Sequence, residues 1–209
     1  MVDCHYLGID NVMALRGDAM REQKYFEATK GGHPYASSLV KQIQELNQGN
    51  YLHEVIETDN CSDFCIGVAG YPEKHMESPS LKSDLKRLKD KLDLGADYVV
   101  TQMFFDNQKY FDFVDACRNA GITVPIIPGL KPITTKTQLN VLPRIFYIDL
   151  PEDLSDAVEK CKTKEEVRAV GIEWAISQSK QLMDAGVPVL HYYSMGKSGS
   201  VLKIAKELF

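Results

Sequence analysis

The stretch SLKSDLKRLKDKLDLGADYVVTQM, residues 80–103, carries the pattern that decides the fold. From Leu81 to Leu92 it repeats leucine every three or four residues, which is the spacing of one face of an amphipathic helix. Gly95 follows and is placed to end that helix. Residues 98–103 then form a nearly continuous apolar run, as parallel strands covered on both faces do. The stretch therefore predicts a helix over 80–94 followed by a buried strand over 98–103.

The same helix-and-strand unit recurs on both sides of this stretch, which predicts a parallel α/β fold. Ala-Gly or Leu-Gly turns shortly before several strands are typical of (β/α)8 barrels, and the sequence lacks the glycine-rich phosphate loop that a doubly wound sheet usually shows. We therefore favour the barrel over the doubly wound sheet. The other predicted strands span 11–15, 65–70, 124–128 and 189–193, and the other predicted helices span 36–46, 108–120, 164–185 and 200–208.

The number of predicted strands falls short of a closed barrel. A TIM barrel needs eight strands and about 250 residues, whereas the pattern of these 209 residues predicts five strands. Residues 1–8 resemble the end of a helix that leads into the first strand. We therefore expect residues 1–209 to form a single domain, a TIM (β/α)8 barrel truncated at the N-terminus to about five βα units.

Composition and charge narrow the class of protein. The net charge of −5 argues against a nucleic-acid partner, which would require a basic stripe. No apolar run approaches the roughly 18 residues of a membrane span, and the N-terminus lacks a signal sequence. The five cysteines have no CxxC spacing, so we expect reduced thiols in a cytoplasmic protein and no metal site. Homo-oligomer formation is left open.

Polar residues gather where the predicted strands end, and active sites of barrels form at those ends. Each of these residues has an ordinary structural role as its alternative, such as a turn, a helix cap or a loop hydrogen bond. Gln102 carries the stronger argument, because an amide in such an apolar strand must find hydrogen-bond partners. Ligand atoms at the rim are one source of such partners. The sequence therefore predicts a polar ligand site on one rim.

At these same positions the sequence resembles the methylenetetrahydrofolate reductase family. Five motifs carry the resemblance in the order expected of the family, and together they extend over nearly the whole chain. They are NVMALRGD at 11–18, VAGYPEKH at 68–75, TQMFFD at 101–106, PIIPG at 125–129 and HYYSM at 191–195.

The resemblance implies a TIM barrel that holds FAD. Hydride passes from NADH or NADPH to the flavin and then to 5,10-methylenetetrahydrofolate, which becomes 5-methyltetrahydrofolate. Asp18 is implied to tune hydride donation by the flavin, and Gln102 to contact the folate and the nicotinamide in turn. The implied flavin contacts are Arg16, Gly17, Asp18, Tyr35, Ala36, Tyr71, His75, Asp84 and Lys91. The implied substrate contacts are Gln102, Gln138, Tyr193 and Lys197.

The sequence departs from the family pattern in three places. The family's general acid is a glutamate on the first strand, and no segment of this sequence matches it; Glu73 lies in a later loop and is not assigned that role. Lys197 stands where the family pattern ends in arginine, and Arg87 and Asp90 differ from the residues of some members. We expect a flavin-dependent oxidoreductase whose activity is impaired in this chain alone. A non-catalytic flavin- or folate-binding module and an unrelated barrel enzyme are the alternatives.

Overall fold

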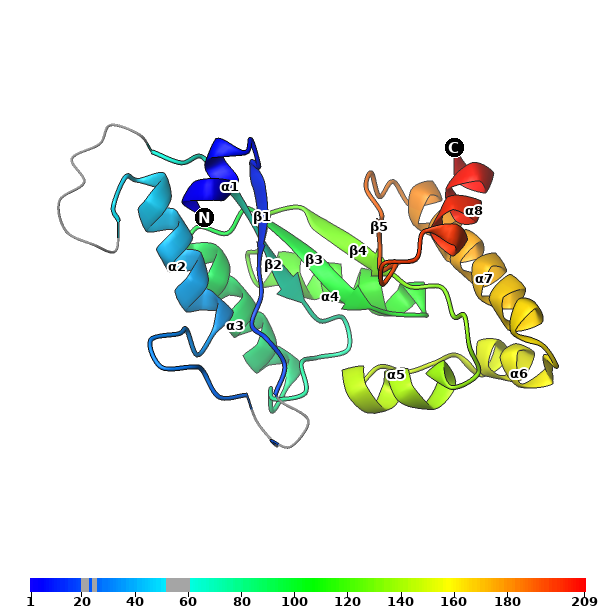
Figure 1. Ribbon diagram of the computed structural model, residues 1–209. Coiled ribbons are helices and arrows are strands. Elements are labelled where there is room, and N and C mark those ends of the chain that lie inside the picture. Colours follow the sequence, from blue (N-terminus) through cyan, green and yellow to red (C-terminus); the bar gives the residue numbers. More distant parts are fainter. Residues whose placement is uncertain (20–22, 24–25, 52–60) are drawn as a thin grey trace. The chain divides into compact units, whose positions relative to one another are not determined.

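The computed structural model describes residues 1–19, 23, 26–51 and 61–209. Helices and strands alternate along most of the chain (Figure 1). The strands are β1 (Asn11–Ala14), β2 (Cys65–Gly70), β3 (Tyr98–Met103), β4 (Ile126–Leu130) and β5 (His191–Tyr192). The helices are α1 (Val2–Tyr6), α2 (Ala36–Asn47), α3 (Leu81–Asp93), α4 (Asn107–Asn119), α5 (Gln138–Phe146), α6 (Glu152–Lys160), α7 (Lys164–Asp184) and α8 (Gly199–Leu208).

The strands form one sheet in the order β1-β2-β3-β4-β5, which is also their order along the chain. β1 runs parallel to β2 with Ala14 opposite Val68, and β4 runs parallel to β5 with Gly129 opposite His191. A doubly wound sheet reverses its strand order at a switch point, whereas a barrel adds each strand on the same side. The observed order confirms the α/β class and favours the barrel over the doubly wound sheet.

Several predicted elements agree closely with the structure, and others differ for identifiable reasons. β2 and β3 have the predicted bounds, and α1 confirms that helical residues precede the first strand. β4 begins two residues later than predicted, after Pro125, whose ring nitrogen has no N–H to donate to a neighbouring strand. α5 and α6 were not predicted. α5 contains Pro143, which reads as a helix breaker in sequence, and α6 follows Pro151 as its N-cap.

The contacts of the chain cluster into two compact units. Unit 1 comprises residues 1–69, 86–99 and 122–125, and unit 2 comprises residues 70–85, 100–121 and 126–209. In unit 1, Gln44 of α2 donates to the main-chain oxygen of Gly95 at 2.6 Å. The main-chain N–H of Ile66 in β2 donates to Asp97 at 2.7 Å. These bonds tie α2 and β2 to the turn that precedes β3.

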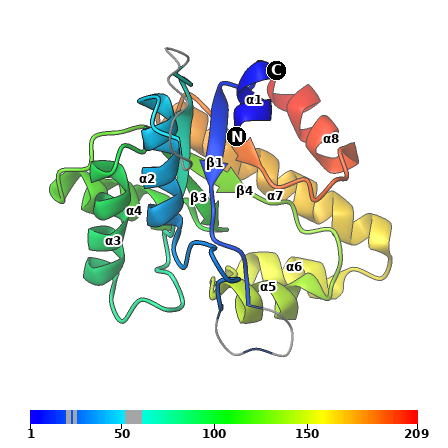
Figure 2. The same cartoon turned by 60° about the vertical axis from the view of Figure 1, so that its left-hand side comes forward.

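Unit 2 has its core under α5, α6 and α7. One cluster of buried side chains includes Met103, Phe105, Ile133, Leu154 and Val158. α8 lies beside α7 in both ribbon views (Figure 2), and a second buried cluster joins these two helices. A Cβ at Gly171 of α7 would overlap the main-chain oxygen of Ile133. Glycine is therefore required where α7 approaches the segment that follows β4.

Candidate functional site

The strand ends of unit 2 are joined by hydrogen bonds around Thr101. This residue of β3 is fully buried. Its hydroxyl oxygen accepts the N–H of Gly129 at 2.9 Å, and its main-chain oxygen accepts the hydroxyl of Tyr193 at 2.8 Å. A Cβ on Gly129 would overlap the Thr101 oxygen and lie 2.7 Å from the Tyr193 ring. Glycine in the PIIPG motif thus allows the tyrosine that follows β5 to cross β4 and reach β3.

Gln102 lies next to this junction, so the structure brings it close to Tyr193. Its side-chain oxygen accepts the N–H of Met103 at 3.0 Å. The side-chain nitrogen makes no hydrogen bond to any residue that the structure describes. Burial raises the pKa of Tyr193, which keeps its hydroxyl a neutral donor. One oriented amide nitrogen and one fixed phenol therefore stand at this strand end.

The loop between β2 and α3 is organised by Asp84. One oxygen of its carboxylate accepts the N–H of His75 at 3.0 Å, and the other accepts the hydroxyl of Ser78 at 2.8 Å. The ring of Tyr71 meets the His75 ring edge-on at a centroid distance of 4.6 Å. Asp84 thus lies at the start of α3 and fixes the loop that carries two of the predicted flavin contacts. All of these residues belong to unit 2.

The remaining predicted flavin contacts belong to unit 1. The guanidinium of Arg16 lies over the Phe26 ring, 5.2 Å from its centroid. Gly17 and Asp18 are exposed, and Asp18 has no hydrogen bond or ion pair within the described ranges. Tyr35 is the N-cap of α2 and is 60% exposed, and Ala36 is the first residue of the helix.

Lys91 lies in the last turn of α3, also in unit 1. Its ammonium donates to the main-chain oxygen of Ala69 in β2 at 2.6 Å. A half-buried lysine held by a strand carbonyl is a positioned positive charge.

Two predicted substrate contacts have different surroundings. The side-chain oxygen of Gln138 accepts the N–H of Thr134 at 2.6 Å and that of Thr135 at 3.1 Å. Gln138 therefore closes the turn that precedes α5, which leaves its side-chain nitrogen for a ligand. Lys197 is exposed in the turn before α8. Its main-chain N–H donates to Ser194 at 3.0 Å.

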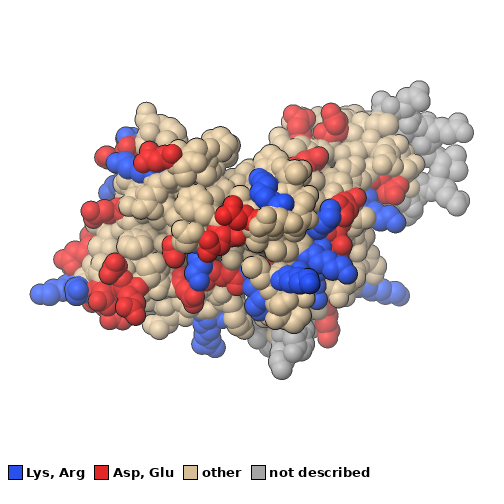
Figure 3. All heavy atoms as spheres, turned by 180° about the vertical axis from the view of Figure 1, so that it is seen from behind, with Lys and Arg blue, Asp and Glu red and all other residues tan. Residues whose placement is uncertain are grey.

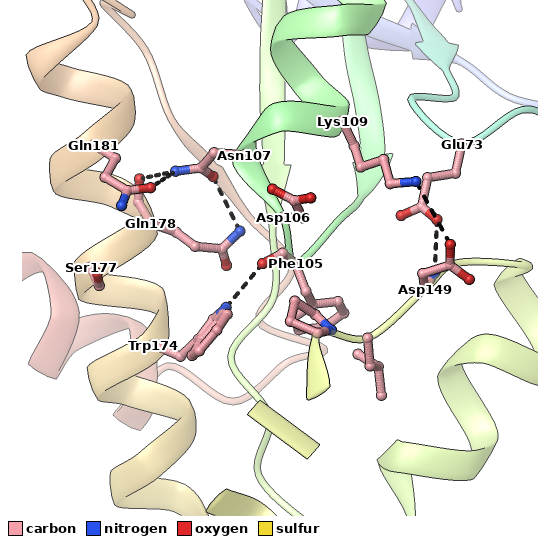
Figure 4. Close-up of a pocket in the computed structure, with 12 residues that line it drawn as sticks. Glu73, Phe105, Asp106, Asn107, Lys109, Asp149, Trp174, Ser177, Gln178 and Gln181 are labelled. Atoms are coloured by element: carbon pink, nitrogen blue, oxygen red, sulfur yellow. Dashed lines mark hydrogen bonds and ion pairs between the residues drawn. The ribbon is translucent and has the colours of Figure 1, made fainter. Parts of the chain in front are cut away.

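The side chain of Glu73 lines a polar pocket of unit 2 (Figure 4). Its carboxylate accepts the N–H of Asp149 at 2.8 Å. Burial raises the pKa of Glu73, the nearby Asp149 and Asp106 raise it further, and the Asp149 N–H and Lys109 lower it. Glu73 therefore joins two loops.

Sequence reasoning missed Thr101 and the polar residues of the pocket in Figure 4. Thr101 reads as an ordinary strand residue, and only its distances to Gly129 and Tyr193 reveal its position at a junction. For Gln178 the sequence pattern did contain a signal of burial, because this residue lies on the face of α7 that also carries the buried Gly171, Ala175 and Leu182. A buried amide on such a face needs partners.

Basic and acidic side chains are interspersed over the described part of the face in Figure 3. Within residues 1–19, 23, 26–51 and 61–209, no three His, Cys, Asp or Glu side chains are grouped to hold a metal ion. No helix in those same residues is long and apolar enough to span a bilayer.

Comparison with solved structures supports the fold. A protein from Clostridium thermocellum matches 91% of this chain and 65% of its own, with a TM-score of 0.58 and 20% identity. That protein, described as uncharacterized, binds two copies of 5-methyl-5,6,7,8-tetrahydrofolic acid. At this identity the likeness concerns the fold alone.

Sequence comparison identifies the relatives. A probable methylenetetrahydrofolate reductase (NADPH) of Caenorhabditis elegans is 36% identical over 97% of this chain, which covers 28% of that protein. Methylenetetrahydrofolate reductase (NADH) 1 of Arabidopsis thaliana is 36% identical over 96% of the chain, which covers 33% of the plant protein. The chain thus spans about a third of the length of these curated relatives. The family model for methylenetetrahydrofolate reductase matches residues 1–209, and the chain therefore belongs to the methylenetetrahydrofolate reductase family.

Proposed function

We propose that residues 1–209 act as the flavin- and folate-binding domain of a methylenetetrahydrofolate reductase. The reaction is the reduction of 5,10-methylenetetrahydrofolate to 5-methyltetrahydrofolate by NADH or NADPH, with FAD as the cofactor. The observation that carries the proposal is the family match over the entire chain. The polar groups after β2, β3 and β5 agree with it, because barrel enzymes place their sites at such strand ends.

The donor set of this chain fits a flavin dinucleotide. Lys91 offers a half-buried ammonium for the diphosphate, and Arg16 offers a second cation. Tyr71 and His75 offer an aromatic pair on a loop held by Asp84. Tyr35 and Ala36 open α2, whose N-cap side chain makes no capping bond, and a helix N-terminus favours an anion. We assign Arg16, Gly17, Asp18, Tyr35, Ala36, Tyr71, His75, Asp84 and Lys91 to the cofactor. When bound, FAD would supply the hydride acceptor and donor that amino-acid side chains lack.

The substrate is held by amide and phenol groups. The side-chain nitrogen of Gln102 donates to whichever substrate occupies the site, while its oxygen remains bonded to Met103. Gln138 donates in the same way from the turn before α5. Tyr193 packs against the substrate with its hydroxyl fixed on Thr101. Lys197 offers a positive charge to a folate carboxylate, without the bidentate fork of arginine.

Asp18 supplies an exposed carboxylate. Its negative charge affects the two hydride transfers, to the flavin and from the flavin, in opposite directions. A negative charge beside the cofactor disfavours electron uptake and favours hydride donation. In the intact enzyme, Asp18→Asn should slow the folate half-reaction more than the nicotinamide half-reaction, measured separately by stopped-flow absorbance. Equal losses in both would restrict Asp18 to holding the cofactor and would remove it from the catalytic residues.

Residues 1–209 taken by themselves should turn over slowly even with FAD bound. Opening of the five-membered ring of the folate requires a proton donor, and a positioned acid typically contributes about 10² to 10⁴ in rate. The motifs of this chain do not include the family's acid glutamate. The test is turnover of the purified chain with added FAD, both nicotinamides and methylenetetrahydrofolate, beside a full-length relative. Turnover within about tenfold of that relative contradicts impairment. If the chain and N-terminally extended forms of it all show flavin absorbance but no turnover, the alternative of a non-catalytic flavin- or folate-binding module is favoured.

A further inference from the structure

Unit 2 contains a pocket that none of the residues assigned to the flavin or the substrate lines (Figure 4). Its volume is about 320 Å³, which is in the lower range of small-molecule sites. α4 and the residues before it form one wall, α7 forms the second, and the segment before α6 forms the third. The lining residues used below are Glu73, Asp106, Lys109, Asp149, Trp174 and Gln178.

A buried amide network fixes the orientation of Gln178 in this pocket. Asn107 donates through its side-chain nitrogen to the main-chain oxygen of Gln178 at 3.0 Å and to Gln181 at 2.8 Å. The side-chain oxygen of Asn107 must therefore be the acceptor of the Gln178 amide nitrogen, at 3.2 Å. That assignment turns the Gln178 side-chain oxygen into the open space of the pocket, as Figure 4 shows.

The Gln178 oxygen is an acceptor with no partner among the residues that the structure describes. The residue itself is only 5% exposed. No fully enclosed side-chain oxygen or nitrogen of the described residues lacks a hydrogen bond, so solvent reaches this oxygen from the pocket. A donor on a ligand can take the place of that water. The indole of Trp174 forms the adjacent wall and is held by its N–H bond to the Phe105 oxygen at 3.1 Å.

The charges of the pocket are unbalanced toward the negative. Three carboxylates line it, those of Glu73, Asp106 and Asp149, against the single ammonium of Lys109. Lys109 lies 3.7 Å from Asp149 and also acts on Glu73, whose pKa it lowers, so one ammonium is shared among three carboxylates. An acceptor-rich pocket beside an aromatic wall attracts an organic cation through hydrogen bonds and cation–π contact.

We propose that this pocket binds a small planar organic cation that carries N–H donors, an amidinium or a guanidinium. One edge of such a group donates to Gln178 and to a carboxylate, and its face lies against Trp174. The site goes beyond the proposed reductase reaction and requires neither flavin nor folate, so it can fail or succeed independently of that function.

Benzamidine is the probe, and benzamide is its neutral counterpart of the same shape. Trp174 is the only tryptophan of the sequence, so its indole N–H gives a single nuclear magnetic resonance signal at the pocket wall. Titration of residues 1–209 with benzamidine should shift this signal in a saturable manner, and benzamide should bind at least about tenfold more weakly. Equal binding of the two probes, or a signal that does not move, overturns the proposal.

Two variants locate the binding. Glu73→Gln keeps an oxygen that accepts the Asp149 N–H and removes the charge, and it should weaken benzamidine binding by about tenfold. Asp156→Asn removes an exposed charge from α6 outside the pocket and should leave the affinity within about twofold, as expected of a screened charge. Equal weakening by both variants, or no weakening by Glu73→Gln, shows general attraction to a negative protein and refutes the site.

Discussion

The strand ends around Thr101 and the segment after β1 both carry predicted site residues, but they are supported very differently. In the first region Thr101 and Gly129 are buried, and hydrogen bonds of 2.8 and 2.9 Å hold Tyr193 and β4 in place. In the second region Asp18 is exposed and has no bonded partner within the described ranges, and the guanidinium of Arg16 lies over the Phe26 ring. The first region is held by buried contacts of the fold, whereas Asp18 in the second is open to solvent. Substitutions should therefore cost stability in the first region and binding in the second.

Gly129→Ala should show the largest effect on the free energy of unfolding. The new methyl group overlaps the Thr101 oxygen and approaches the Tyr193 ring, so strands must separate at a cost of about 2 to 3 kcal/mol. Urea unfolding followed by circular dichroism measures the change. Gly199→Ala is the matched control, since a Cβ there meets nothing within 4 Å. Similar unfolding midpoints for the two variants would refute the prearranged junction.

Asp84→Ala should have the next largest effect. It removes the acceptor of two hydrogen bonds, one from the N–H of His75 and one from the buried Ser78. Loss of these bonds should cost about 2 kcal/mol. Asp90→Ala, on the exposed face of the same helix, should change stability by less than about 0.5 kcal/mol. If both variants unfold at the same urea concentration, Asp84 does not organise the loop.

Alkaline pH should weaken the core of unit 2 through Tyr110 and Cys117 of α4. Burial raises the pKa of Tyr110 to about 12 and that of Cys117 to about 11, from ordinary values of 10.0 and 9.0. A raised pKa means that the unfolded chain loses its proton first. Stability is therefore full below about pH 9 and falls as pH rises toward 12.

Tyr110→Phe isolates one of these two groups. It loses the bond from the hydroxyl to the Ile126 oxygen, which should cost about 1 kcal/mol at neutral pH. Between about pH 10 and 12 its stability should decline less steeply than that of the parent chain, because Tyr110 no longer titrates while Cys117 still does. Parallel pH profiles of the two proteins would show that Tyr110 does not contribute to alkaline unfolding.

Asp18→Asn should have the smallest effect on folding. An exposed carboxylate without a bonded partner should change the free energy of unfolding by less than about 0.5 kcal/mol. Urea unfolding of this variant and of Gly129→Ala compares how much each region contributes to the free energy of unfolding. A loss above about 1 kcal/mol would show that the segment after β1 is also prearranged, and the contrast between the regions would disappear.

Local sequence patterns predicted the helices and strands in which apolar residues recur at the usual spacing of a helix or run on as in a buried strand. The leucine repeat and Gly95 predicted α3, and the apolar runs at 65–70 and 98–103 predicted β2 and β3. Arg16 and Tyr71 were predicted to follow strands and Gln102 to lie near the end of one, because barrels gather their site residues where the strands end. α5 escaped prediction because Pro143 is tolerated inside it.

Only the tertiary structure decided which side chains meet. Tyr193 reaches Thr101 across a separation of 92 residues because Gly129 has no side chain. Asn107 and Gln178, 71 residues apart, form one amide network and turn an oxygen into a pocket. Periodicity along the chain fixes which face a residue occupies, but it carries no information on which distant residue lies opposite. The sequence by itself thus determined most of the elements and the family, while packing determined the junction at Thr101 and the pocket beside Trp174.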